Sequence, residues 1–193
     1  MYYVRSIKEG KWDDHDRWSM YTFEDLHTSE LGLSVWAVKR NRIEDIKEIA
    51  LAIALTKDAI RSVWLCLIPT DKLKCYKIRI KRSNGDTKYK KLANRHVDIQ
   101  VPKLKDLLKI HYYLYQHWNQ NKHKTNELMK FISQTELEQL FIQKVNDGEL
   151  DDFIKMTIKN KKEKDYKKYY KMLMGNSHVQ AIEASINNNN KNN

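Results

Sequence analysis

The sequence predicts an α+β fold, with a mixed or antiparallel N-terminal sheet that includes a basic β-hairpin, followed by a helical C-terminal region. Two observations lead to this class. Short runs of strand length crowd the first half of the chain, whereas the second half repeats apolar residues at helical spacing. Strands that precede helices in this way are typical of α+β proteins. With 193 residues, of which 41% are hydrophobic and 32% charged, the chain can form one substantial core.

Several runs of the first half are predicted to be strands, at positions 2–7, 33–38, 63–68 and 97–101. Pro69 and Pro102 end the last two, because proline cannot donate to a β-ladder. Between the second and third runs, residues 43–55 place isoleucine and alanine at helical spacing. The order strand, helix, strand is compatible with a parallel βαβ crossover and also with an antiparallel arrangement.

The stretch 74–92, KCYKIRIKRSNGDTKYKKL, predicts a β-hairpin with Asn84 and Gly85 at its tip, the pair favoured in a type I′ turn. A two-residue turn places Ile80 opposite Tyr89 and Lys81 opposite Lys88. One face of the ribbon is then apolar, and the other gathers lysine and arginine. Like charges directly opposite one another destabilise a sheet by about 0.2–1 kcal/mol per pair. Such a face therefore suggests a polyanion or an acidic protein as its partner.

The second half is predicted to be helical at 104–118, at 125–145 with Thr125 as the N-cap, and in shorter helices at 150–158 and 165–174. The chain therefore divides into a sheet-containing core at 1–118 and a helical region at 119–186, which is either part of the same domain or separate. The low-complexity tail at 187–193 is expected to be disordered.

Charge is strongly basic and unevenly spread. The chain has 36 Lys and Arg against 25 Asp and Glu, a formal net charge of +11 and a pI near 9.4. Positions 72–91 hold nine basic residues and one acid, and 155–171 hold eight lysines and two acids, whereas 124–152 hold three lysines and seven acids. Net charge speaks to partners and solubility rather than to fold. Nucleic acid is the commonest polyanion for such a surface, although an AT-rich coding sequence also produces a lysine-rich surface without any partner.

Two sets of residues are the candidates for nucleic-acid binding. The hairpin contributes Lys77, Arg79, Lys81, Arg82, Lys88 and Lys90. A helical stripe at spacing i, i+3, i+4, i+7 contributes Lys164, Lys167, Lys168 and Lys171. Because lysine contacts phosphate as a point charge, we expect mostly phosphate-backbone contacts with weak sequence specificity, to DNA or RNA. The alternative for the helix is a solvated lysine face over an aromatic face that packs on the domain.

Histidine and acid clusters are the candidates for catalysis. Asp13 and Asp16 lie in the polar segment KWDDHDRW, and His96 and Asp98 share one face of the predicted strand at 97–101. Together they could hold a divalent metal in a small nuclease of an antiviral or mobile-element context. The alternative is a polar turn and the solvent side of a half-buried strand. The sequence contains no glycine-rich phosphate loop, HExxH motif or paired CxxC motif, and we expect no cofactor.

Three functions remain from these observations. The first is a non-enzymatic, cytoplasmic, basic protein that binds nucleic acid through its hairpin. The second is an interaction or assembly subunit of a protein complex, which uses complementary basic and acidic patches and also allows self-association. The third is the metal-dependent nuclease. Cys66 and Cys75 form no disulfide framework, and no run is long enough to span a bilayer, so we expect reduced thiols and no membrane partner.

Overall fold

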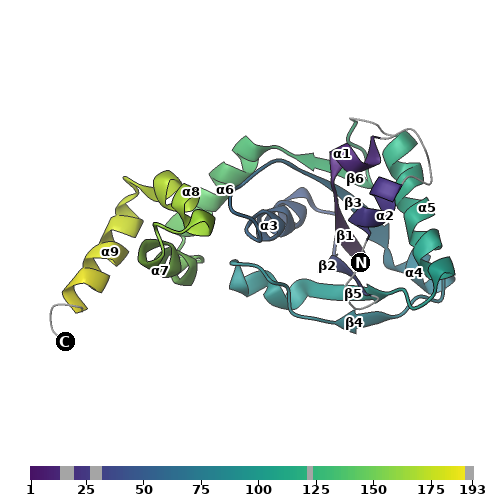
Figure 1. Ribbon diagram of the computed structural model, residues 1–193, viewed down its shortest axis with the longest axis horizontal. Coiled ribbons are helices and arrows are strands. Elements are labelled where there is room, and N and C mark those ends of the chain that lie inside the picture. Colours follow the sequence, from purple (N-terminus) through teal and green to yellow (C-terminus); the bar gives the residue numbers. More distant parts are fainter. Residues whose placement is uncertain (14–19, 27–31, 121–123, 190–193) are drawn as a thin grey trace.

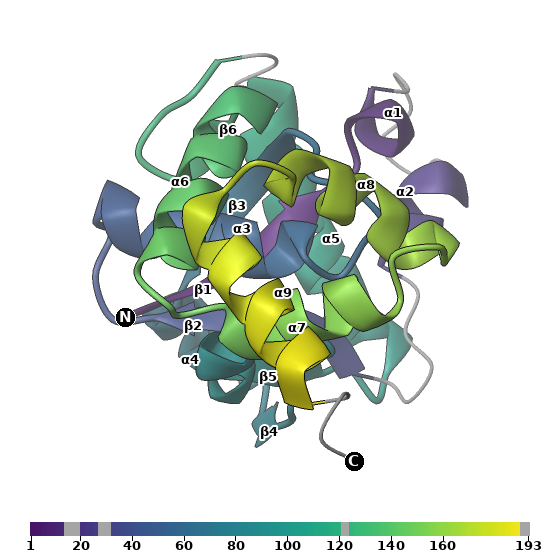
Figure 2. The same ribbon diagram turned by 90° about the vertical axis from the view of Figure 1, so that its left-hand side faces the viewer.

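The computed structural model describes residues 1–13, 20–26, 32–120 and 124–189 (Figures 1 and 2). A six-stranded sheet in the order β4-β5-β2-β1-β3-β6 forms its centre, and every paired neighbour is antiparallel. The elements are β1 (Tyr2–Ile7), α1 (Glu9–Trp12), α2 (Met20–Asp25), β2 (Gly32–Val38), α3 (Ile43–Ala54), β3 (Val63–Pro69), α4 (Thr70–Cys75), β4 (Ile80–Arg82), the 3-10 helix η1 (Lys90–Arg95), β5 (His96–Gln100), α5 (Leu104–Gln120), β6 (Met129–Ile132), α6 (Gln134–Asn146), α7 (Asp151–Lys159), α8 (Lys164–Leu173) and α9 (Ser177–Asn189).

The α+β class is confirmed, because the antiparallel sheet is built mainly from the first half of the chain and helices follow it. Strands β2 and β3 both run antiparallel to β1, which lies between them. They are therefore parallel to each other, and α3 connects them across β1. The predicted helix at 43–55 thus serves as a crossover, with one strand inserted between the two strands that it joins.

The sheet divides along its centre. Strands β1 and β2 pair from Tyr2 and Val38 to Val4 and Trp36, whereas β1 continues to pair with β3 as far as Ile7. Strand β2 in turn pairs with β5 from its first residue. Beyond Val4 the sheet therefore separates into one leaf of β1, β3 and β6 and another of β2, β5 and β4.

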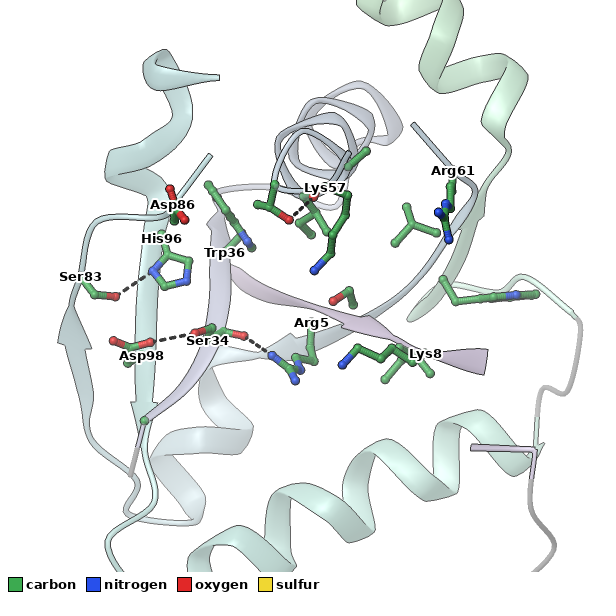
Figure 3. Close-up of a pocket in the computed structure, with 18 of the residues that line it drawn as sticks. Arg5, Lys8, Ser34, Trp36, Lys57, Arg61, Ser83, Asp86, His96 and Asp98 are labelled. Carbon is green, nitrogen blue, oxygen red and sulfur yellow. Dashed lines mark hydrogen bonds between the residues drawn. The ribbon is translucent and has the colours of Figure 1, made fainter. Parts of the chain in front are cut away.

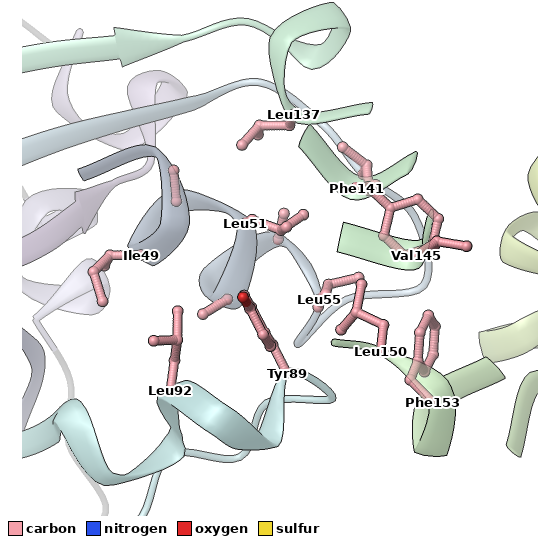
Figure 4. Close-up of a cluster of buried hydrophobic side chains, with 14 of the residues drawn as sticks. Ile49, Leu51, Leu55, Tyr89, Leu92, Leu137, Phe141, Val145, Leu150 and Phe153 are labelled. Carbon is pink, nitrogen blue, oxygen red and sulfur yellow. The ribbon is translucent and has the colours of Figure 1, made fainter. Parts of the chain in front are cut away.

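Hydrophobic side chains fill both faces of the sheet. In Figure 1 the sheet curls around α3, which packs on its concave face. Helix α6 packs on α3, and α7 adds Phe153 and Ile154 to the same cluster. Figure 4 shows this cluster, in which Leu51, Tyr89 and Phe141 come from segments far apart in the sequence. On the convex face, α5 covers alternate strand residues such as Leu33 and Ile99. This alternation is the period of two that half-buried strands require.

The predicted hairpin is correct only in part: β4 pairs with the next strand, but Lys74 and Cys75 belong to α4, residues 90–95 form η1, and the predicted partner and register are wrong. Strand β4 pairs with β5, so that Lys81 lies opposite Asp98 and Ile80 lies opposite Ile99. Tyr89, expected on the second hairpin strand, is fully buried in the concave-face cluster. Burying a large aromatic side chain contributes about 1.5–3 kcal/mol, which outweighs the local turn preference. The observed register also replaces a lysine–lysine contact with a lysine–aspartate contact.

The single helix predicted at 125–145 is also wrong. Strand β6 adds to the edge of the sheet beside β3, with Met129 and Ile132 buried. Helix α6 begins after Ser133, whose hydroxyl accepts a hydrogen bond from the Glu136 amide while the Glu136 carboxylate accepts one from the Ser133 amide. This capping box is a strong local start signal. The predicted N-cap, Thr125, lies too early in the chain because the prediction did not take the Ser133 and Glu136 capping pair into account.

The C-terminal helices share the concave-face core with α3, through residues such as Tyr169 and Ile182. Helix α9 includes Asn187 and continues to Asn189, within the tail that was expected to be disordered, and the rest of that tail lies outside the described residues. Within the described ranges, no helix is both long enough and apolar enough to cross a membrane. Cys66 is buried and Cys75 exposed, and both thiols are free.

Candidate functional site

A cleft of about 880 Å³ opens where the two leaves of the sheet separate, beyond the C-terminal end of α3 (Figure 3). We call it the fork cleft. The strands contribute polar side chains to its floor, and the loops at 56–62 and 83–86 contribute to its rim. Its lining includes Ser34 and Trp36 of β2, Lys81 of β4, and His96 and Asp98 of β5.

Arg5 lies at the apex of the fork cleft, where β1 and β2 part. Its Nη1 donates a hydrogen bond to the Ser34 carbonyl at 2.9 Å, and its Nη2 donates one to the Asp25 carbonyl. Its Nε is buried and has no hydrogen-bond partner in the described part of the chain. Burial lowers the pKa of Arg5, and the negative charge of Asp25 partly counteracts this. The arginine thus satisfies a carbonyl of β2 at the level where β1 and β2 no longer pair.

The two sides of the fork cleft carry opposite chemistry. Figure 3 shows Lys8, Lys57 and Arg61 on one side, and Asp86, His96 and Asp98 on the other. Lys8 is paired with Asp25 at 3.2 Å and Arg61 with Asp58 at 3.7 Å. Lys57 is exposed and forms no ion pair with any residue that the structure describes. It is therefore the cation of this wall that is most available to a ligand.

His96 is held in place and faces the fork cleft. Its Nδ1 lies 2.8 Å from the Ser83 hydroxyl, and its ring meets Trp36 edge-on with ring centroids 5.1 Å apart. Burial lowers the pKa of His96, and Asp98 partly counteracts this. The imidazole is therefore neutral at pH 7, where it offers a hydrogen-bonding nitrogen rather than a charge.

Asp98 accepts a hydrogen bond from the Ser34 hydroxyl at 3.3 Å. Within the described residues, no hydrogen bond joins the carboxylate of Asp98 to the imidazole of His96. In a Ser-His-Asp triad, the aspartate bonds one imidazole nitrogen while the other takes the serine proton. The contacts of Ser83, His96 and Asp98 therefore do not form such a triad. The arrangement offers hydrogen-bond acceptors and a neutral imidazole to a ligand.

Gly85 allows the loop at 83–86 to approach this wall closely. A Cβ atom at Gly85 would lie 2.6 Å from Cη2 of Trp36 and 2.9 Å from Cβ of His96. Its amide donates to the Ala93 carbonyl at 3.1 Å, which ties the loop to η1. Gly85, which was expected to form a hairpin tip, is therefore needed because the loop packs closely on Trp36 and His96.

A second hollow of about 360 Å³ lies between the segment that follows α4 and the start of α5. We call it the basic hollow. Its exposed cations are Lys77, Arg79, Lys103 and Lys105. Lys109 also lines it, but its ammonium is bound to Asp106 at 3.2 Å. Gln100 lines both the basic hollow and the fork cleft, so the two adjoin at the end of β5.

The structure exposes most of the predicted binding residues of the hairpin segment. The exposed ones are Lys77, Arg79, Lys81, Arg82 and Lys90. Lys88 differs, because its ammonium donates to the Lys57 carbonyl at 2.9 Å and lies over the rings of Tyr166 and Tyr169. Burial accordingly lowers the pKa of Lys88. Lys88 thus helps to pack α8 on the loop that follows α3.

The lysine stripe of α8 lies on the solvent side of that helix, with Lys164, Lys167, Lys168 and Lys171 all exposed. On the opposite side Tyr169 is buried, and its hydroxyl donates to the Lys57 carbonyl at 3.0 Å. Lys168 pairs with Asp58 of the fork-cleft rim at 3.0 Å. These contacts place α8 beside the fork cleft.

The catalytic candidates do not assemble in the described part of the chain. His96 and Asp98 do share the fork cleft, as their spacing on one strand predicted. Asp13 instead follows Trp12 of α1, which packs in the cluster on the convex face. Asp16 lies outside the described residues. Among the residues that are described, no three His, Cys, Asp or Glu side chains are grouped to hold a metal ion.

The cations on one side of the fork cleft, Arg5, Lys8, Lys57 and Arg61, which we call the cation wall, were not among the predicted site residues. Arg5 had a usable signal, because it is the one charged residue in an otherwise strand-like run at 2–7. Lys57 and Arg61 had none, since they lie in a polar loop that only the tertiary fold brings to β1. Comparisons of the chain with protein-family models, with curated proteins and with solved structures found no match.

Proposed function

We propose that the protein binds nucleic acid, mainly through the phosphate backbone, along a continuous basic track. The track runs from the basic hollow past Gln100 and β4, across the fork cleft, to the lysine stripe of α8. The observation that supports it most strongly is that the two hollows adjoin at Gln100. The pair between Lys168 and Asp58 joins the third basic segment to the same opening.

The charges along this track favour an anionic ligand. Its uncommitted cations, which have no ion-pair partner among the described residues, include Arg79, Lys81 and Lys57. Two of its acids are already neutralised, since Asp58 pairs with Lys168 and Asp106 pairs with Lys109. Exposed cations in a row bind a polyanion largely by releasing its condensed counterions.

The residue types predict weak sequence specificity. Lysine predominates, and its ammonium contacts phosphate as a point charge, whereas bidentate reading of guanine favours arginine. Basic residues on the edge strand β4 also discourage edge-to-edge pairing with another sheet. That protective role does not explain Lys103 and Lys105, which lie outside β4 and line the basic hollow.

The alternative of an assembly subunit has less support in the structure. The acidic segment at 124–152 was expected to dock a basic partner, but several of its carboxylates are used internally. The pairs are Glu136 with Lys47, Glu149 with Lys144 and Lys91, and Asp151 with His178. Fewer free acidic side chains therefore remain for a second chain.

The test uses two Lys-Arg dipeptides that share the same residue types. Lys81 and Arg82 lie on the track. Lys39 and Arg40 follow the C-terminal end of β2, the end away from the division of the sheet, and all four side chains are exposed. Labelled single- and double-stranded DNA and RNA are titrated at several salt concentrations by fluorescence anisotropy. We expect neutralisation of the first pair (Lys81→Gln, Arg82→Gln) to weaken binding and to reduce the salt slope by about 1.4–1.8, the loss of two phosphate contacts.

The control variant (Lys39→Gln, Arg40→Gln) should leave the salt slope unchanged. Circular dichroism of each variant confirms that the fold is intact. No binding at low salt to any of the nucleic acids would refute the proposed function. Equal weakening by both variants would refute the proposed track, because it would show that total charge rather than position governs binding.

A further inference from the structure

The fork cleft is larger than backbone binding needs. Binding along a surface requires exposed cations, whereas sites for small molecules are hollows of about 300–1,000 Å³. The fork cleft, at about 880 Å³, lies within that range and reaches down to Arg5 at its apex, whose Nε is buried. A hollow of this size on the proposed track could receive part of the bound strand.

The cation wall suits a phosphate group. Figure 3 shows Lys57 extending into the cleft from above, with Arg5 and Lys8 below it. Arg5 has no carboxylate in ion-pair contact within the described chain, since both of its hydrogen bonds go to main-chain carbonyls. An anion would gain from this charge in a partly dry site, where electrostatic attraction is stronger than in water.

The C-terminal end of α3 lies beside this wall and would by itself repel an anion, because the carbonyls of a helix end carry partial negative charge. Those carbonyls are already engaged. The Tyr169 hydroxyl donates to the Ala54 carbonyl of α3 and to the Lys57 carbonyl in the turn beyond it, and the Lys88 ammonium donates to the Lys57 carbonyl. The Thr56 hydroxyl donates to the Ile53 carbonyl. The end of α3 therefore opposes a phosphate less than a free helix end would.

The facing wall suits a nucleobase. Asp98 and Asp86 are hydrogen-bond acceptors, and His96 adds a neutral imidazole beside the indole of Trp36. Carboxylates accept hydrogen bonds from exocyclic amino groups such as that of cytosine. Uracil and thymine lack such a group, and the N3–H is the single ring donor that they can offer to these acceptors.

We propose that the fork cleft is a pocket for one nucleotide, whose phosphate lies against Lys57, Lys8 and Arg5 and whose base lies against the wall of His96 and Asp98. This inference rests on the proposed function, because it assigns the cleft to one unit of the bound strand. The pocket prefers a base with an exocyclic amino group. The same chemistry is offered by a free nucleoside monophosphate and by a nucleotide of a longer strand.

The experiment titrates the full chain with cytidine monophosphate, uridine monophosphate, cytidine and inorganic phosphate by isothermal calorimetry. We expect cytidine monophosphate to bind most tightly, and Lys57→Gln to weaken it by about tenfold or more, the usual loss for a hydrogen bond to a charged group. Asp98→Asn should reduce the preference for cytidine over uridine monophosphate. Lys39→Gln is the matched control for charge, and it should change neither affinity nor preference.

A second variant separates the pocket from the track. Neutralising Lys164 and Lys167 of α8 should weaken binding of an oligonucleotide but leave cytidine monophosphate binding unchanged. Comparing a 5′-phosphorylated oligonucleotide with its 5′-hydroxyl form distinguishes a strand end from an internal nucleotide, since only an end contributes a terminal phosphate.

The outcomes distinguish the two proposals. If oligonucleotides bind with a steep salt slope while cytidine monophosphate does not bind at millimolar concentration, the pocket is refuted and the proposed function stands. If the monophosphate binds and no strand does, the proposed function is refuted. Binding of inorganic phosphate as tightly as cytidine monophosphate would refute the base wall, and absence of all binding would refute both proposals.

Discussion

Replacing Gly85 with alanine tests why a glycine occupies this position. In a type I′ hairpin the residue needs a positive φ, but the glycines with positive φ in the described chain are Gly148 and Gly175. Gly85 is needed because an added Cβ would meet Trp36 at 2.6 Å and His96 at 2.9 Å. Carbon atoms attract one another at about 3.5–4.0 Å and repel at these distances. The methyl group must therefore displace either the indole or the start of β5.

Overpacking of this kind typically costs about 1–3 kcal/mol. We expect Gly85→Ala to lie in the upper half of that range, because Trp36 is only 6% exposed and Cβ of His96 moves only with its backbone. In a protein of this length each kcal/mol lowers the melting temperature by about 2–4 °C. Urea unfolding measures the free energy, and thermal unfolding measures the melting temperature.

Gly10→Ala is the matched control, since nothing lies within 4 Å of a Cβ at Gly10 and its helix α1 favours alanine. It should leave stability unchanged or raise it by up to about 1 kcal/mol. If Gly85→Ala proves as stable as the Gly10→Ala control, the close packing of the loop on the fork cleft is refuted. Gly85→Ala should also weaken nucleotide binding, because the added methyl group displaces Trp36 or His96, which line the fork cleft.

Three further predictions concern ionisable groups. Lys144 binds Glu48 at 2.8 Å and Glu149 at 3.1 Å, so Lys144→Ala leaves Glu48 unpaired and Glu149 with Lys91 alone, and should cost about 2–4 kcal/mol in urea unfolding, somewhat below the value for a fully buried pair. The hydrogen bond from Tyr89 helps to lower the pKa of Glu149 to about 2, so its stabilisation is present above pH 4.5 and is lost as the pH falls towards 2. Glu149→Gln should flatten stability against pH in that window. Burial lowers the pKa of His96 below 6.5, so the native state resists its protonation and stability falls as the pH drops below 6.5; thermal unfolding of His96→Gln between pH 7 and 5 should lack this component.

Strands β1, β2, β3 and β5 and the crossover helix α3 were predictable because their apolar patterns are local in the sequence. Apolar alternation at 97–101 correctly placed Val97 and Ile99 on the buried face and His96 and Asp98 on the other. The pairing of β4 was not predictable in this way. Asn-Gly is a strong local turn signal, but the position of Tyr89 depends on Glu149 and on the helices that cover α3, which are distant in the sequence.

The candidate site was predictable in part for the same reason. The clustering of charge in the sequence predicts that the cations of β4 and α8 are exposed. It does not predict that the two groups lie on neighbouring surfaces. Lys88 belongs to the same cluster in sequence, yet its contacts with Tyr166 and Tyr169 remove it from the exposed set. Local spacing cannot distinguish a lysine that packs between two aromatic rings from one that faces solvent.

Arg5 connects the division of the sheet with the polarity of its cleft. The partly buried guanidinium of Arg5 needs acceptors, and it obtains the Ser34 carbonyl because β2 does not pair with β1 at that level. The side chains on the facing strands, among them His96 and Asp98, are polar and cannot be covered by an apolar helix without loss. Helix α3 accordingly ends at Ala54, before it reaches them. A leucine at position 5 would lack these hydrogen bonds and favour closure of the fork, so Arg5→Leu should abolish nucleotide binding even if the protein stays folded.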